Sequence, residues 1–203
     1  MNTAASDVES MIAQLVRGPY VLVGHSMGGK IALALAARRP ADLEALVLVA
    51  PSPPTAEPIP QTERERLLSA HGDELAAAVT ADAIVAHALA PALRRQVIED
   101  SVRSSREAWR AWLDRGSRED ISALVPNIVV PTLVVSSDAD MVIPQALLEV
   151  ELLSRVRHAR LVVLHDVGHL SPLECPAGLS WVIASELARK CTAGQSAKAR
   201  RPT

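Results

Sequence analysis

Apolar and polar residues alternate along the chain in two different patterns. Short apolar runs rich in Val and Leu predict buried β-strands, and they span residues 20–24, 43–50, 129–136 and 161–164. Longer segments repeat apolar residues at helical spacing and predict helices over residues 6–17, 30–39, 144–155 and 176–190. Strands that alternate with helices at this spacing favour parallel pairing. We therefore expect an α/β fold: a mostly parallel sheet flanked by helices.

The start of the first helix has a local signal of its own. Ser6 and Glu9 have the spacing of a capping box, in which the serine side chain and the glutamate side chain satisfy free backbone N–H groups. This pattern predicts that the helix begins at Ser6.

The segment between the second and third predicted strands has a different pattern. Prolines concentrate in residues 51–60 and indicate an exit linker. Residues 61–124 show helical spacing without a strand pattern, and they are broken near Gly72, Pro91 and Gly116. We expect a helical insertion that covers the edge of the sheet where Ser26 lies.

These patterns divide the chain into three parts. Residues 1–50 and 125–192 are expected to form the core, and residues 51–124 the helical cap insertion. Residues 193–203 are small and polar, and we expect a disordered tail there.

Composition excludes several classes of partner. The 203 residues carry a net charge of −2 and form no basic stripe, which argues against nucleic acid as a partner. No apolar run is long enough for a membrane span, and residues 1–17 lack the pattern of a signal peptide. Cys175 and Cys191 would lie about 24 Å apart on one helix, too far for a disulfide, so a reduced, cytoplasmic setting is expected.

Candidate chemistry begins where the first strand meets the second helix. Gly24-His25-Ser26-Met27-Gly28 is a G-x-S-x-G sequence between a strand and a helix. Such a turn forces Ser26 into a strained conformation and points its side chain outward. We expect glycines on both sides because a Cβ there would clash. The helix N-terminus favours developing negative charge, so Ser26 is predicted to be a nucleophile rather than part of a plain Gly-rich turn.

A serine nucleophile needs a base and an orienting acid from the same edge of the sheet. Asp138 and Asp140 follow the strand at 129–136. His165 and His169 follow the strand at 161–164, and only His169 is preceded by a glycine, Gly168. Two histidines and two aspartates could also suggest a metal site, but no H-x-x-x-H or H-x-H spacing supports one.

Three motifs together resemble the α/β-hydrolase superfamily, in its esterase, lactonase and haloperoxidase-like branch. Within residues 20–185, the nucleophile turn is Gly24-His25-Ser26-Met27-Gly28-Gly29. The acid strand is Pro131-Thr132-Leu133-Val134-Val135, followed by Asp140 and Pro144 in its loop. The histidine loop is Gly168-His169 with Pro172 and Glu174. The resemblance implies that Ser26 is the nucleophile, His169 the base and Asp140 the acid. It favours Asp140 over Asp138, and it implies that the backbone N–H of Met27 stabilises the oxyanion and that no cofactor is used.

For several other residues near the site, a structural role is the alternative to a functional one. His25 is expected to support the turn or to line the substrate pocket. Trp109 and Trp112 lie in the cap, and packing is favoured over substrate contact. The remaining histidines fall in helical or surface contexts, and no partner is expected for them: His71, His87 and His158.

The resemblance is incomplete before Pro19, where only one helix is predicted. The superfamily has further strands there, and a loop usually marked by a His-Gly pair supplies its second oxyanion donor. We therefore expect an N-terminally truncated hydrolase with weak activity. The strand at 20–24 would then be an edge strand, which favours self-association.

The leading functional expectation is a serine hydrolase. Its substrate would be a small ester, lactone or thioester, cleaved through an acyl-enzyme. A catalytically impaired fragment or a non-enzymatic binding relative is the alternative from another class, and a cofactor-free haloperoxidase-like activity would use the same three residues.

Overall fold

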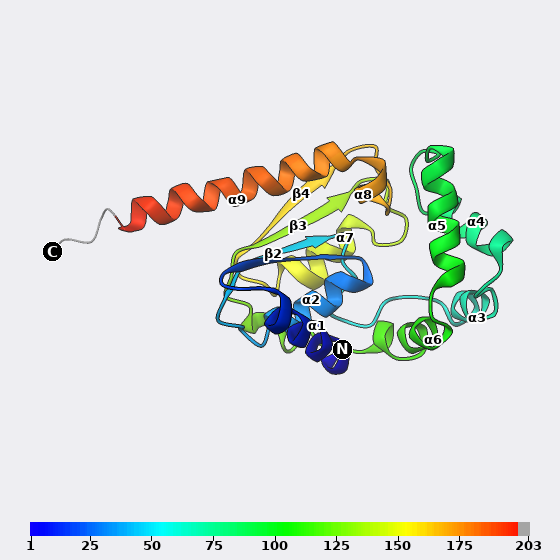
Figure 1. Cartoon of the computed structure of the whole chain (residues 1–203), viewed down its shortest axis with the longest axis horizontal. Helices are drawn as coiled ribbons and strands as arrows, with labels where there is room; N and C mark the ends of the chain where they lie inside the picture. Colours follow the sequence, from blue (N-terminus) through cyan, green and yellow to red (C-terminus); the bar gives the residue numbers. More distant parts are fainter. Residues whose placement is uncertain (199–203) are drawn as a thin grey trace.

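The computed structural model describes residues 1–198 and contains one parallel sheet of four strands (Figure 1). The strands lie side by side in the order in which they occur along the chain: β1 (Tyr20–His25), β2 (Leu43–Val49), β3 (Thr132–Ser137) and β4 (Ala159–Leu164). Each neighbouring pair is parallel, with Val23 opposite Val47, Val47 opposite Leu133 and Leu133 opposite Arg160. The predicted α/β fold with a parallel sheet and flanking helices is confirmed.

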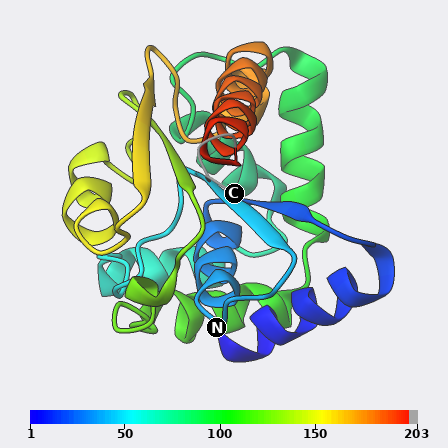
Figure 2. The same ribbon diagram turned by 90° about the vertical axis from the view of Figure 1, so that its left-hand side faces the viewer.

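The two faces of the sheet are buried under different helices (Figure 2). Leu46, Leu48 and Val134 pack on one face against α1 (Asn2–Leu15), α2 (Met27–Ala36) and the helical turns α7 (Gln145–Leu148) and η3 (Glu149–Leu153). Val47, Val49, Leu133 and Val135 pack on the other face against α9 (Pro176–Lys198). Alternate residues of a strand point to opposite faces, so a nearly continuous apolar run is needed to bury both faces.

The cap lies between β2 and β3. Its helices are α3 (Gln61–Ser69), α4 (Glu74–Ala83), α5 (Pro91–Arg103) and α6 (Arg106–Asp114), followed by the short turn η1 (Gly116–Arg118). The next turn, η2 (Val125–Asn127), belongs to the core, where Val125 is fully buried. The cap helices stand as a column beyond the carboxyl ends of the strands, to the right in Figure 1. The cap therefore faces the edge of the sheet where the candidate residues lie.

Local signals explain where the cap helices begin. The side chain of Asp73 accepts the N–H of Ala76 at the start of α4, and Ser105 does the same for Ala108 at the start of α6. Pro91 occupies the first turn of α5, where its missing N–H costs nothing. Gly72 has a φ of 86°, a conformation that favours glycine, in the turn between α3 and α4.

Two helix boundaries differ from the sequence prediction. Helix α1 begins at Asn2, so Ser6 lies inside the helix and the predicted capping box is wrong. The carbonyl of Ser6 instead accepts the hydroxyl of Ser10. The helix begins before Ser6 because the apolar contacts of Ala5 with the core extend it towards its N-terminus. Helix α9 continues to Lys198, so residues 193–198 are helical where a disordered tail was expected; residues 199–203 lie outside the described part.

Among residues 1–198, no helix is both long enough and apolar enough to cross a membrane.

Candidate active site

The backbone of Ser26 is strained and firmly held. Its φ of 51° and ψ of −122° lie outside the regions that L-residues normally adopt, as expected for a strand that turns directly into a helix. The N–H of Ser26 donates to the carbonyl of Val49, and its own carbonyl accepts the N–H groups of Gly29 and Ser52. These three hydrogen bonds stabilise the strained turn and leave the side chain free to project.

Close packing requires two of the glycines around Ser26: Gly24, as expected, and Gly29 in place of Gly28. A Cβ on Gly24 would lie 2.5 Å from the carbonyl oxygen of Gly28, and a Cβ on Gly29 would lie 2.5 Å from the Cβ of Pro51. A Cβ on Gly28 would meet nothing within 4 Å. The expectation that Gly28 is required by a steric clash is therefore wrong, because the crowded side of α2 is the side that faces the loop after β2.

The structure brings Ser26, His169 and Asp140 together in one hydrogen-bonded chain. The Oγ of Ser26 lies 2.8 Å from Nε2 of His169, and Nδ1 of His169 lies 2.9 Å from Oδ2 of Asp140. An ionised carboxylate only accepts hydrogen bonds, so Nδ1 carries the proton and donates it to Asp140. Nε2 is then unprotonated and accepts the hydroxyl proton of Ser26. This is the arrangement that a base needs in order to activate a serine.

Asp140 is held in place by the backbone that follows it. Its Oδ1 accepts the N–H groups of Val142 and Ile143 at 2.8 and 2.9 Å, while Oδ2 faces His169. Only 1% of the Asp140 side chain and 5% of the His169 side chain are exposed. Because both groups are shielded from water, their attraction is stronger than that of a surface pair. The carboxylate can therefore stabilise a positive charge that forms on His169.

The competing residues Asp138 and His165 pair with each other instead. Oδ2 of Asp138 lies 2.9 Å from Nδ1 of His165, and its Oδ1 accepts the N–H of Asp166. The hydrogen bond from His165 holds the pKa of Asp138 below its ordinary value, with a further contribution from the Asp166 N–H. Both side chains are exposed, so this is a surface pair separate from the buried chain of Ser26, His169 and Asp140.

Met27 opens helix α2 directly after Ser26. The N–H groups of the first turn of a helix have no acceptor within the helix, and the helix dipole favours a negative charge near them. The Met27 N–H is thus available for a negatively charged oxygen formed at Ser26. The Met27 side chain is 43% exposed.

The three residues expected as pocket candidates have different surroundings. Nε2 of His25 donates to the carbonyl of His169 at 2.9 Å, so His25 contacts the candidate base directly. Trp109 donates from its indole N–H to the carbonyl of Leu67 in α3. The ring of Trp112 lies against Gly116. The contacts of both tryptophans lie within the cap, which favours the packing interpretation for them.

Contacts between the cap and the loop of His169 could not be read from local sequence. The N–H of His169 donates to the carbonyl of Ile84, between α4 and α5. A Cβ on Gly168 would lie 2.5 Å from the nitrogen of Ala86, so Gly168 is needed for this close approach rather than for backbone freedom of His169. Oε2 of Glu174 accepts the N–H groups of both Gly168 and Ala86. The cap is thus hydrogen-bonded directly to the loop that carries His169.

A buried lysine was also missed. Lys30, in α2, is fully buried and donates from Nζ to the carbonyl of Thr55. Burial lowers the pKa of Lys30, and the charge of Glu57 partly offsets this. Burial raises the pKa of Glu57, while the charges of Lys30, Arg64 and His169 act in the opposite direction. A lysine in a helix normally indicates an exposed face, so the sequence around Lys30 gave no signal that its side chain is buried.

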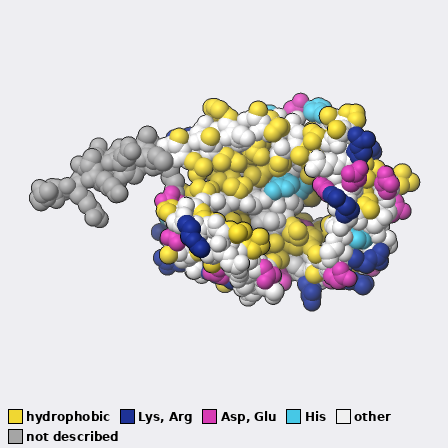
Figure 3. Space-filling view, in the orientation of Figure 1, with side chains coloured by type: hydrophobic (Ala, Val, Ile, Leu, Met, Phe, Trp, Pro, Cys, Tyr) yellow, Lys and Arg dark blue, Asp and Glu magenta, His cyan; other side chains and the backbone are white. Residues whose placement is uncertain are grey.

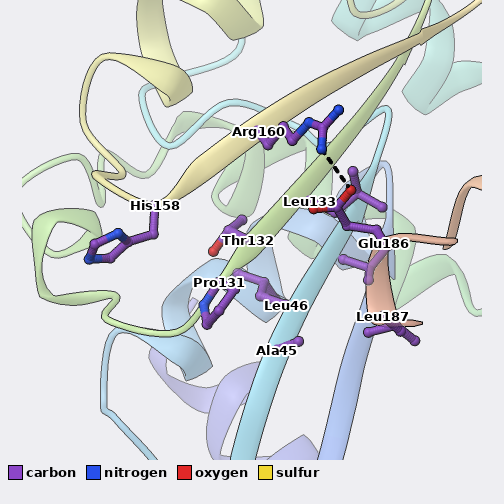
Figure 4. A pocket seen from close by; sticks show the side chains of 10 residues that line it. Ala45, Leu46, Pro131, Thr132, Leu133, His158, Arg160, Glu186 and Leu187 are labelled. Atoms are coloured by element: carbon purple, nitrogen blue, oxygen red, sulfur yellow. Dashed lines mark hydrogen bonds and ion pairs between the residues drawn. The ribbon is translucent and has the colours of Figure 1, made fainter. Parts of the chain in front are cut away.

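One cavity lies away from the candidate residues. A cavity of about 50 Å³ lies near the amino ends of the central strands, between the sheet and α9, and is lined by His158, Pro131, Arg160 and Glu186 among others (Figure 4). The space-filling view shows a hollow between the core and the cap, on the right (Figure 3). Among the described side chains, no group of His, Cys, Asp and Glu is arranged to hold a metal ion.

The order of Ser26, Asp140 and His169 along the chain, on loops of one parallel sheet, is typical of α/β hydrolases and differs from the order in other serine hydrolase folds. The model of the alpha/beta hydrolase family matches residues 2–180, and the chain belongs to this family.

Individual relatives agree with this assignment. The sn-1-specific diacylglycerol lipase ABHD11 of Mus musculus is 51% identical over 49 residues, which is 24% of this chain and 16% of that relative's length. The esterase EaEST of Exiguobacterium antarcticum superposes with a TM-score of 0.82 at 23% identity, covering 91% of this chain and 72% of the esterase. A bromoperoxidase of Bacillus anthracis gives a TM-score of 0.83 at 15% identity, with coverage of 91% and 72%. At these identities the two structures show the fold alone.

Proposed function

We propose that the protein is a serine hydrolase that cleaves a small carboxylic ester, lactone or thioester through an acyl-enzyme. The observation that carries this proposal is the 2.8 Å distance between Oγ of Ser26 and Nε2 of His169, with Asp140 on the other ring nitrogen. A serine hydroxyl is a weak nucleophile until a base takes its proton, and this geometry provides that base.

The reaction would proceed in two halves. Oγ of Ser26 attacks the substrate carbonyl carbon while Nε2 of His169 takes the hydroxyl proton, and the N–H of Met27 stabilises the negative oxygen. His169 then gives the proton to the leaving alcohol or thiol as its bond to the carbonyl carbon breaks. His169 then takes a proton from water, whose oxygen attacks the carbonyl carbon of the acyl group on Ser26. The bond from that carbon to Oγ breaks, His169 returns the proton to Oγ, and the acid is released. Asp140 stabilises the positive charge of His169 in both halves.

The relatives support an ester-type substrate without defining it. Their names include an esterase and a diacylglycerol lipase. The matched segment is 16% of the length of the lipase, and the esterase is 23% identical, so neither transfers its own substrate to this chain. The class of bond cleaved is therefore proposed from the geometry of Ser26, His169 and Asp140.

Labelling with a fluorophosphonate tests the proposal. This reagent phosphonylates an activated serine with release of fluoride, and mass spectrometry locates the modified residue. We expect the adduct on Ser26 of the purified chain, no adduct in Ser26→Ala, and normal labelling in Ser10→Ala, since Ser10 lies on the exposed face of α1. A folded protein that is not labelled on Ser26 would contradict the proposal and favour a non-enzymatic binding protein.

A further inference from the structure

His25 connects the strand that carries the serine to the loop that carries the base. It is the last residue of β1, directly before Ser26. His169 arrives from β4, at the other end of the sheet. Nevertheless, Nε2 of His25 lies 2.9 Å from the carbonyl oxygen of His169, and the two ring centroids are 5.1 Å apart with a tilt of 41°.

The direction of this hydrogen bond is fixed by its acceptor. A carbonyl oxygen cannot donate, so Nε2 of His25 carries a proton and donates it. Burial lowers the pKa of His25. The hydrogen bond to the His169 carbonyl and the charge of Asp140 act in the opposite direction, whereas the charge of His169 lowers the pKa further. A neutral ring with its proton on Nε2 makes this bond without placing a second positive charge beside His169.

The other bonds of His169 do not replace this one. Its backbone N–H donates to Ile84 of the cap, and its ring contacts Asp140 and Ser26. Among the described residues, the donor to the carbonyl oxygen of His169 is Nε2 of His25. His25 and Ser26 are neighbours in the chain, so this bond fixes the backbone of the base relative to the residue that it must activate.

We propose that His25 is a positioning residue, whose Nε2–H···O=C hydrogen bond holds His169 within proton-transfer distance of Ser26. This inference rests on the proposed function in that it names a support of the same site. It goes beyond that function by giving His25 a part that neither pocket lining nor packing of the turn would require.

Two substitutions separate the hydrogen bond from the volume of the ring. His25→Gln places an amide N–H at a similar distance along the side chain and keeps a donor. His25→Leu fills a comparable space and removes the donor. A role in packing alone predicts that Leu is tolerated at least as well as Gln, whereas a positioning role predicts rescue by Gln.

The first measurement is steady-state hydrolysis of a p-nitrophenyl ester by the purified chain and both variants. Small misplacements of a reacting group cost up to about 100-fold in rate. We expect His25→Leu to lower kcat about 10-fold to 100-fold with little change in KM, and His25→Gln to stay within about 3-fold of the parent. Equal rates for all three proteins, or an equal loss in both variants, would overturn the proposal.

The second measurement does not depend on activity. Hydrogen exchange of the peptide that contains Gly168, His169 and Leu170 reports how firmly the loop is held. We expect faster exchange in His25→Leu and parent-like exchange in His25→Gln. Unchanged exchange in His25→Leu would show that the hydrogen bond from His25 does not hold the loop. If the parent chain hydrolyses no ester but exchange still follows this pattern, the proposed function fails while the role of His25 in holding the loop stands.

Discussion

Oε2 of Glu174 accepts the backbone N–H of Ala86 at 2.8 Å, and this bond joins the core to the cap across 88 positions of sequence. The same oxygen accepts the N–H of Gly168, next to His169. One carboxylate oxygen therefore holds both the cap and the loop of His169. It keeps the cap segment in contact with the site.

Replacing Glu174 is expected to destabilise this junction. Glu174→Ala leaves two backbone N–H groups without their acceptor, and each buried unsatisfied group costs about 1–3 kcal/mol. We expect a lower free energy of unfolding in urea and faster hydrogen exchange of residues 84–86. Glu99→Ala, at an exposed position of α5, is the matched control and should change little. Unchanged exchange at residues 84–86 in Glu174→Ala would show that other contacts hold the cap.

Gly28 and Gly29 should respond in opposite ways to the same substitution. Gly29→Ala places a Cβ 2.5 Å from that of Pro51, so overpacking should lower stability by about 1–3 kcal/mol. Gly28→Ala meets open space inside α2 and should be neutral or stabilise the helix by about 0.5–1 kcal/mol. Urea unfolding of both variants checks the sign. Equal destabilisation would mean that the loop at Pro51 yields easily.

Asp140 and Asp138 offer a test of which carboxylate orients the base. Asp140→Asn removes the acceptor that fixes the proton of His169 on Nδ1, and it should lower kcat for ester hydrolysis on the order of 10⁴-fold. Asp138→Asn alters an exposed pair with His165 and should leave kcat within about 3-fold, since exposed pairs contribute little. Comparable losses in both variants would refute the assignment.

The lowered pKa of His25 predicts a pH dependence of stability. Burial favours the neutral ring in the folded protein, so between the lowered pKa and the ordinary value of 6.5 the unfolded chain binds more protons. Stability from this residue is therefore complete above about pH 6.5 and is lost as the pH falls through the folded pKa. Urea unfolding from pH 8 to pH 5 should show a shallower decline for His25→Gln than for the parent. Parallel curves would mean that His25 titrates normally.

The open side of β1 predicts self-association. Within the described sheet, β1 pairs with β2 alone, and Val23 is 53% exposed. Exposed apolar edge strands tend to pair with other strands, and a charge on the edge blocks this. We expect sedimentation velocity to show concentration-dependent association that Val23→Lys reduces. Val79→Lys, at a 59% exposed position of α4, is the control, and a chain that stays monomeric at all concentrations would refute the expectation.

Local patterns predicted much of the fold and the strained turn at Ser26. The apolar runs of β1 and β2 and the G-x-S-x-G turn depend on neighbouring residues, so they can be read from a few positions. The conformation of Ser26 also follows from the chain itself, because a strand that enters a helix directly has few backbone solutions. The helical spacing of residues 61–124 likewise predicted a cap built from helices.

Tertiary structure alone decided the contacts between distant segments. Asp138 and Asp140 lie in one loop, and only the positions of β4 and its loop show which of them meets His169. The crowding of Gly29 depends on Pro51, and the bond from His25 to His169 spans 144 positions. Such contacts depend on how the layers pack, and packing leaves no periodic signal in the sequence. The sequence alone determined which residues were available for the chemistry, and the packing of sheet, helices and cap decided which of them meet.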